Sequence, residues 1–156
     1  ARNCAGLKKA NSEEFDDKSN SSEDHLIYHL SKWVKGQKVE IRTKVQNKGG
    51  TMRLGAYPAK IKKGTMAYSI YKKAIVSERH RHRFEVNVNY QKALEDSGLT
   101  FSGFSQDGSL PEVVELSSHP FFLGVQFHPE LKSKPFEPHP IFSNFIKKAL
   151  EQTRLV

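Results

Sequence analysis

The order of apolar and polar residues predicts a domain of short strands and a few helices. Short apolar or alternating segments, which favour strands, lie at 26–30, 39–42, 51–61, 99–104, 113–116 and 121–127. The 121–127 segment ends with Gly124-Val125-Gln126-Phe127, and a histidine follows directly. Residues 16–25 are polar and without period, which indicates a loop.

Helices are predicted at four places. Residues 1–9 resemble the end of a helix, and 66–71 form a short one with Thr65 as its N-cap. Residues 89–98 have a capping asparagine, Asn89, and a terminating glycine. The last helix begins at Pro140, and its apolar residues fall on one face: Ile141, Phe142, Phe145, Ile146, Ala149 and Leu150.

One predicted strand alternates arginine and histidine from Arg79 to Arg83. The arginines then face one side, and His80 and His82 face the other. The run lacks the interleaved aromatics that stack on bases, and Glu78 and Glu85 flank it. Both a phosphate-binding patch and a structural strand with ion pairs fit this pattern.

Composition narrows the class of protein. The 156 residues suffice for one domain, and no stretch approaches a membrane span or a signal peptide. A single cysteine excludes an internal disulfide framework and fits the cytoplasm. The net charge of +8 comes from dispersed lysines, so we expect a solvated surface with no nucleic-acid and no membrane partner.

The most specific chemical signal is a histidine and a carboxylate two residues apart, His128 and Glu130, at the end of the 121–127 strand. In an extended chain such residues share a face, so the carboxylate can orient the imidazole as the base of a nucleophile. Pro129 between them ends the strand pairing. A surface histidine beside an unrelated acid fits the same spacing. The histidines show no ligand spacing with a supporting third group, so no metal site is expected.

Five motifs, taken together, carry a resemblance to a known family. They are Ala10 to Phe15, Gly49 to Gly55, Glu78 to Asn87, His119 to Phe122 and Gln126 to Glu130. In this order the chain resembles the class I glutamine amidotransferase domain of CTP synthases, from about residue 1 to about 150. The resemblance implies an α/β fold with a mostly parallel sheet flanked by helices. It also implies that 1–156 is a single domain, the C-terminal portion of the amidotransferase, with the N-terminal part missing.

The resemblance also implies site residues. His128 and Glu130 are then catalytic, while Glu14 and Arg83 bind glutamine, Glu14 through the α-amino group. Thr51 and Arg53 form part of a lid that couples GTP to glutamine hydrolysis. Two departures are small: Glu13 replaces a threonine of the family pattern, and Leu131 replaces a phenylalanine.

The nucleophile is the main departure. A class I amidotransferase needs a cysteine in a Gly-x-Cys-x-Gly turn, and Cys4 has no glycine two residues before it. We therefore expect the nucleophile to lie upstream of residue 1 and this fragment alone to be inactive. The alternative is a non-catalytic binding or regulatory module on an amidotransferase-like fold.

Cofactors and partners follow from the resemblance. No cofactor is expected in this fragment. The resemblance implies that ATP, UTP and Mg²⁺ bind to an absent synthase domain, which aminates UTP to CTP. This amination is a ligase reaction of pyrimidine biosynthesis. Glutamine is the substrate of this part, GTP is an allosteric activator, and the full-length enzyme is expected to be a homo-oligomer.

Overall fold

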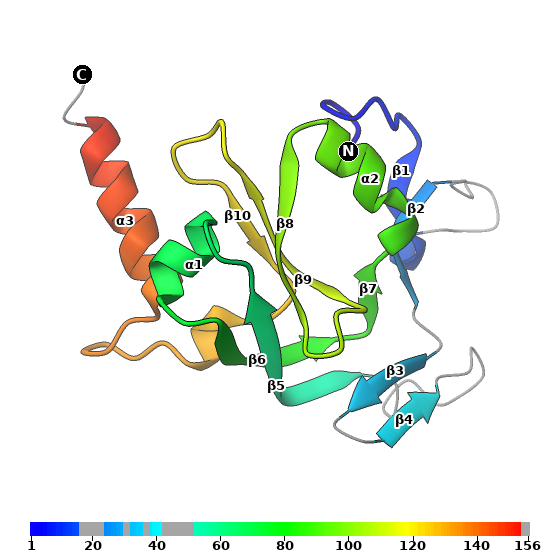
Figure 1. The fold of residues 1–156 in the computed structure, drawn as a ribbon, viewed down its shortest axis with the longest axis horizontal. Coiled ribbons are helices and arrows are strands. Elements are labelled where there is room, and N and C mark those ends of the chain that lie inside the picture. Colours follow the sequence, from blue (N-terminus) through cyan, green and yellow to red (C-terminus); the bar gives the residue numbers. More distant parts are fainter. Residues whose placement is uncertain (16–23, 30–31, 36–37, 42–51, 154–156) are drawn as a thin grey trace.

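The computed structural model describes residues 1–15, 24–29, 32–35, 38–41 and 52–153, as three sheets and three α-helices within these ranges (Figure 1). The largest sheet has five strands in the order β10-β9-β8-β5-β6. These strands are β5 (Arg53–Ile61), β6 (Ile75–His82), β8 (Leu99–Ser105), β9 (Pro111–Leu116) and β10 (Leu123–Val125).

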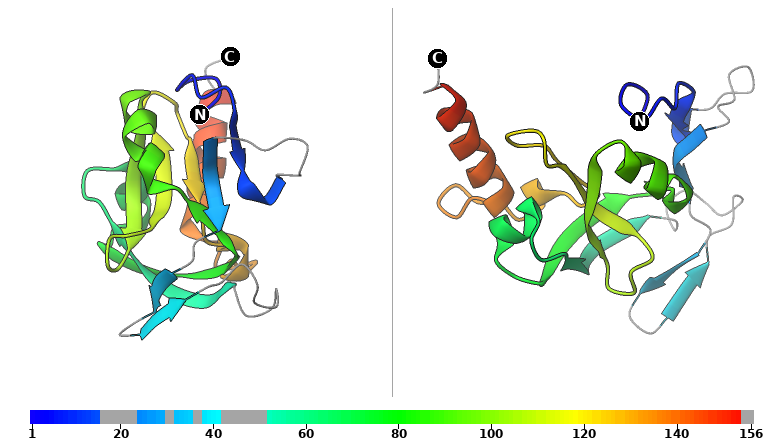
Figure 2. Two further views of the ribbon diagram at one scale, coloured as in Figure 1. Left: turned by 90° about the vertical axis from the view of Figure 1, so that its right-hand side faces the viewer. Right: turned by 45° about the horizontal axis from the view of Figure 1, so that its top comes forward.

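The smaller sheets and the helices complete the described fold. A three-stranded sheet has the order β1-β2-β7, with β1 (Ala10–Ser12), β2 (Asp24–His29) and β7 (Phe84–Val86). Strands β3 (Lys32–Lys35) and β4 (Lys38–Ile41) pair with each other. The α-helices are α1 (Met66–Tyr71), α2 (Gln91–Asp96) and α3 (Pro140–Thr153), and the 3-10 turns are η1 (Glu13–Phe15), η2 (Val88–Tyr90) and η3 (Pro129–Leu131). Helix α3 lies at one end of the molecule and the three-stranded sheet at the other (Figures 1 and 2).

The strand directions correct one expectation. Every pair of the five-stranded sheet is antiparallel, and among the described strands only β1 and β2 pair in parallel. The connections explain this, because only residues 106–110 join β8 to β9 and only 117–122 join β9 to β10. A parallel pair needs a crossover of about a dozen residues or more. The sheet described here is therefore mostly antiparallel, not mostly parallel.

The hydrophobic core lies between the five-stranded sheet and two helices. Ala59, Ile61, Val76, Val113 and Phe127 from the sheet and the segment after it pack with Ala67 and Ile70 of α1 and Ile141 of α3. Helix α1 is fixed at its N-terminus by two groups. Thr65 Oγ1 accepts from the Tyr68 amide at 3.2 Å, as predicted, and the Glu115 carboxylate of β9 accepts from the amides of Met66 and Ala67.

Two predicted helix boundaries were wrong. Residues 1–9 form turns, with one helical bond from the Ala5 amide to the Ala1 carbonyl, and no helix. Gly6 has a φ of +70°, which an α-helix does not accept, so the single turn ends there. The second helix is capped by Asn87, whose side chain accepts from the Asn89 amide, and it begins as a 3-10 turn before α2.

Candidate active site

The segment from Gln126 to His128 links β9 to β6, an edge strand of the five-stranded sheet. The Gln126 amide donates to the Glu112 carbonyl of β9 at 3.0 Å, and the His128 amide donates to the Arg79 carbonyl of β6 at 2.8 Å. Between them Phe127 is 3% exposed and packs edge-on against the His80 ring. The backbone of His128 is therefore held between β9 and β6.

The structure brings His128 and Glu130 together. His128 Nδ1 lies 2.7 Å from Glu130 Oε1, with side chains 37% and 57% exposed. The contact arises differently from the expected alternation of a strand: His128 is extended, but Glu130 lies in η3, which begins with Pro129 and turns the carboxylate back. The hydrogen bond from His128 lowers the pKa of Glu130, so this carboxylate is charged at neutral pH. Because Nδ1 is engaged, Nε2 is the nitrogen that can exchange a proton with a nucleophile.

The strand register places the two residues expected to bind glutamine at one end of the three-stranded sheet. Glu14 lies in η1, directly after β1, and Arg83 lies directly before β7. Strand β1 runs parallel to β2, and the last residue of β2, His29, pairs with Phe84. Glu14 is exposed and Arg83 is half-buried. The neighbouring Glu13, which we had treated only as an added charge, accepts from the His29 amide at 2.7 Å and ties η1 to β2.

The two residues expected in a GTP lid have different outcomes. Thr51 lies outside the described residues. Arg53 opens β5 and is 2% exposed; its guanidinium contacts Glu112 at 2.7 Å and Glu85 at 3.3 Å. In this arrangement the Arg53 side chain is an internal ion-pair partner and does not lie on the surface. Its regulatory role stays a prediction.

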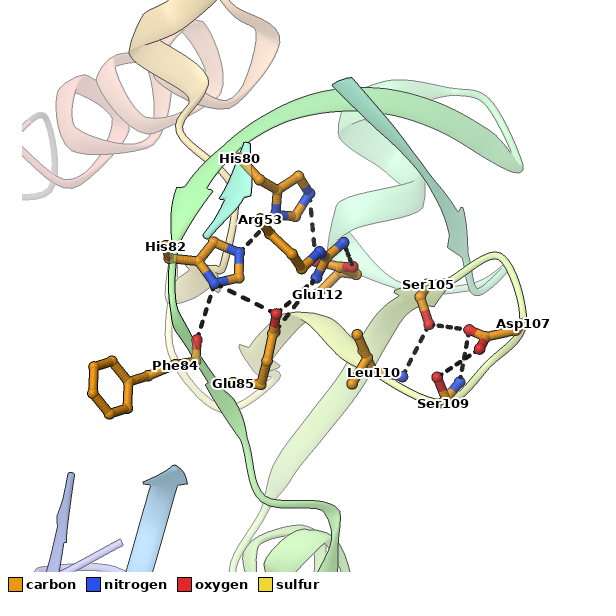
Figure 3. A network of polar contacts seen from close by, with 10 residues as sticks. All are labelled: Arg53, His80, His82, Phe84, Glu85, Ser105, Asp107, Ser109, Leu110 and Glu112. Atoms are coloured by element: carbon orange, nitrogen blue, oxygen red, sulfur yellow. Dashed lines mark hydrogen bonds and ion pairs between the residues drawn. The ribbon is translucent and has the colours of Figure 1, made fainter. Parts of the chain in front are cut away.

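Two imidazole rings in contact, those of His80 and His82, lie beside this ion pair (Figure 3). His82 Nδ1 contacts the Phe84 carbonyl at 2.9 Å, and since a carbonyl only accepts, Nδ1 carries the proton. His80 Nδ1 lies 2.8 Å from His82 Nε2, so one ring donates to the other, and His80 Nε2 lies 3.6 Å from Glu112 Oε2. Burial, with the nearby charge of Arg53, lowers the pKa of His80 to about 2, so the contact with Glu112 is no ion pair at neutral pH.

Cys4 occupies a different part of the molecule. It is exposed and lies in the turns formed by residues 1–9. In Figure 1 these turns lie near α2, whereas the η3 segment lies beside β6, toward the opposite edge of the view. The described residues contain no group of three or more potential metal ligands. Among the same residues, no helix is long and apolar enough to cross a membrane.

The profile of the family "Glutamine amidotransferase class-I" matches residues 29–148, which is most of the chain. The chain belongs to the class I glutamine amidotransferase family. Two relatives of this amidotransferase domain are both named CTP synthase. The protein from Roseobacter denitrificans is 54% identical and that from Maricaulis maris is 56% identical, over the whole of this chain. The chain spans only 29% and 28% of the lengths of these relatives.

A solved structure supports the same assignment. The Trypanosoma brucei CTPS glutaminase domain with bound acivicin matches with a TM-score of 0.78 and 36% identity, over 96% of this chain and 54% of that one. The resemblance and the amidotransferase-like fold predicted from sequence are thus confirmed. The alternative of a non-catalytic module is not favoured by these comparisons.

Sequence reasoning missed several charged residues around the candidate site. Glu112 was not singled out, Lys132 counted only among the dispersed lysines, and Glu78 was named only as a flank of the arginine run. One signal was present for Glu78: it lies on the same strand face as His80, which is the buried one. No local pattern identified Glu112 or Lys132, because their partners lie more than fifty residues away in the sequence.

Proposed function

We propose that this amidotransferase domain hydrolyses glutamine and supplies the ammonia with which a CTP synthase aminates UTP in an ATP-dependent reaction. The single observation that carries the proposal is the 2.7 Å contact between His128 and Glu130, in a chain whose relatives are named CTP synthase. This dyad is the base half of a thiol-dependent amidase.

The chemistry assigned to the dyad follows from its geometry. His128 Nε2 accepts the proton of a cysteine thiol as the thiolate attacks the side-chain amide carbon of glutamine. The imidazolium then donates this proton to the leaving nitrogen, which departs as ammonia and leaves a glutamyl thioester for water to cleave. Glu130 holds the imidazole through Nδ1 and stabilises its cation. Glu14 and Arg83, at one end of the three-stranded sheet, are the proposed contacts of the glutamine α-amino and α-carboxylate groups.

The other components of the proposed reaction are assigned to a longer protein of which this domain would be one part. We place the attacking thiol in the part of the relatives' length that this chain does not span. ATP, Mg²⁺ and UTP are assigned to a synthase domain, and a homo-oligomer and a cytoplasmic location stay predictions. For GTP activation, the burial of Arg53 favours an indirect role of this arginine, through its ion pairs with Glu85 and Glu112, and the role of Thr51 stays a prediction.

The decisive experiment compares two nitrogen sources in the full-length enzyme. His128→Ala should reduce glutamine-dependent CTP formation by about a thousandfold or more, since cooperating catalytic groups lose most of their effect together. Synthesis from free ammonia should stay within about twofold of wild type, because the dyad acts only in ammonia release. His119→Ala, which changes an exposed histidine after β9, is the matched control.

Two results would contradict the proposal. Equal losses with glutamine and with ammonia would mean that His128 supports the fold or the synthase site. Full glutamine-dependent activity in His128→Ala would remove the dyad from the reaction.

A further inference from the structure

Strand β6 contacts both ends of the short turn that carries Glu130. At the start of the turn, the His128 amide donates to the Arg79 carbonyl at 2.8 Å. At its end, the ammonium of Lys132 donates to the Ser77 carbonyl at 2.5 Å and lies 3.5 Å from the Glu78 carboxylate. Three successive residues of one strand thus hold a segment of five residues.

Glu78 is a buried anchor that the proposed chemistry does not use. It is 1% exposed, and its Oε1 accepts from His139 Nε2 at 3.0 Å and from the Tyr71 hydroxyl at 3.1 Å. Burial by itself raises the pKa of Glu78, but the hydrogen bond from His139 and the charges of His139 and Lys132 outweigh it, so the pKa is lowered. Glu78 Oε2 makes no hydrogen bond within the described residues, and Lys132 supplies the charge that faces it.

The turn itself is buried only at its first residue, Pro129. Its internal hydrogen bonds run from the amides of Leu131, Lys132 and Ser133 to the carbonyls of His128 and Pro129. Pro129 is buried, but Glu130 is more than half exposed and Leu131 is 46% exposed, so side-chain burial constrains the start of the turn and hardly the part that follows. A three-residue 3-10 turn with a single buried residue at its start depends strongly on what fixes its ends. The Arg79 carbonyl fixes one end, and Lys132 fixes the other.

We propose that Lys132 is a positioning residue, which clamps η3 onto β6 and so keeps the Glu130 carboxylate against His128. The inference rests on the proposed glutaminase function. Lys132 does not touch the reacting atoms; its side chain forms part of the wall of a neighbouring cavity of about 660 Å³, together with Tyr71, Glu78 and His139. The clamp acts by geometry, since a displacement of about 1 Å in a catalytic group can cost up to a hundredfold in rate.

The test uses the full-length enzyme, three lysine variants and His128→Ala. Lys132→Met keeps the aliphatic stem and removes the ammonium; we expect kcat of glutamine hydrolysis to fall about tenfold, with KM for glutamine within about twofold. Lys132→Arg, which keeps charge and donors, should recover kcat to within about threefold of wild type. Lys134→Met is the matched control, because Lys134 lies in the same loop, is 70% exposed and pairs only with exposed Glu137 among the described residues. Ammonia-dependent CTP formation is measured for each variant and should not change.

The variants distinguish a failure of the proposed glutaminase function from a failure of the Lys132 proposal. If wild type hydrolyses glutamine and His128→Ala does not, the proposed function holds, and Lys132 is judged by its own variants. The clamp is overturned if Lys132→Met matches Lys134→Met, if its loss lies in KM, or if Lys132→Arg fails to restore kcat. Should Lys132→Met not fold, Lys132→Gln takes its place, and wild-type kcat in that variant overturns the clamp.

Discussion

At the scale of the residue, the domain's interior contains one arginine between two glutamates. Arg53 lies 3.3 Å from Glu85 and 2.7 Å from Glu112, all three side chains are at most 2% exposed, and the guanidinium stacks over the Tyr57 ring. Burial raises the pKa of Glu112, although Arg53 opposes this. Two carboxylates therefore share one cation, and removal of that cation leaves both without a counter-charge.

The first prediction concerns this cation. Arg53→Met should lower the free energy of unfolding by about 3–5 kcal/mol, because two buried carboxylates lose their partner. Arg81→Met changes an exposed arginine of β6 and should cost no more than about 0.5 kcal/mol. Urea denaturation of the domain within the full-length protein provides both values. Similar values for the two variants would show that the buried cation is dispensable.

At the scale of the element, strand β6 has one buried face and one exposed face. Burial alternates along it: Val76, Glu78 and His80 are buried, while Ser77 and Arg79 are exposed. The polar residues Glu78 and His80 thus lie on the inner face, and the outward residues supply backbone carbonyls to His128 and Lys132. One strand supports both the core and the proposed active site.

The second prediction follows from His80. Burial and the Arg53 charge lower its pKa to about 2, from an ordinary value of 6.5 in the unfolded chain. The unfolded state therefore binds a proton first as the pH falls, and stability present above pH 6.5 is lost progressively below it. Between pH 7 and pH 5 the loss from this residue is about 2 kcal/mol.

A substitution isolates this contribution. His80→Asn keeps an amide donor toward His82 and removes the titrating group, so its stability relative to wild type should rise by about 2 kcal/mol from pH 7 to pH 5. His119→Asn, at the surface, should follow wild type. Parallel denaturation curves of wild type and His80→Asn at both pH values would rule out His80 as the source.

Elements with local signals were predictable, and those that depend on distant contacts were not. Thr65 and Pro140 mark the starts of α1 and α3 by their own chemistry, and both predictions are confirmed. The contact between His128 and Glu130 was also expected, because two residues of separation limit where a side chain can lie. The antiparallel order of the sheet and the burial of Arg53 were missed, because both depend on pairings across the fold, such as Arg53 with Glu112.

At the scale of the whole molecule, helix α3 has an apolar face that the described residues cover only in part. Ile141 is buried, but Phe142 is 38%, Phe145 52%, Ile146 56% and Leu150 56% exposed. Contiguous exposed apolar side chains mark a contact surface. The chain covers 54% of the glutaminase-domain structure that it resembles.

The last prediction is that the 156-residue chain alone releases no glutamate from glutamine, although it carries the base dyad. His128 and Glu130 need a thiol to activate, and Cys4 is exposed in turns away from η3 (Figure 1). Loss of one cooperating group removes most of the effect of the others. The assay compares the chain, its Cys4→Ser variant and the full-length enzyme, after a cooperative unfolding transition has shown that the chain is folded. We expect activity only in the full-length enzyme; turnover by the chain that Cys4→Ser abolishes would make Cys4 the nucleophile and require a different active site.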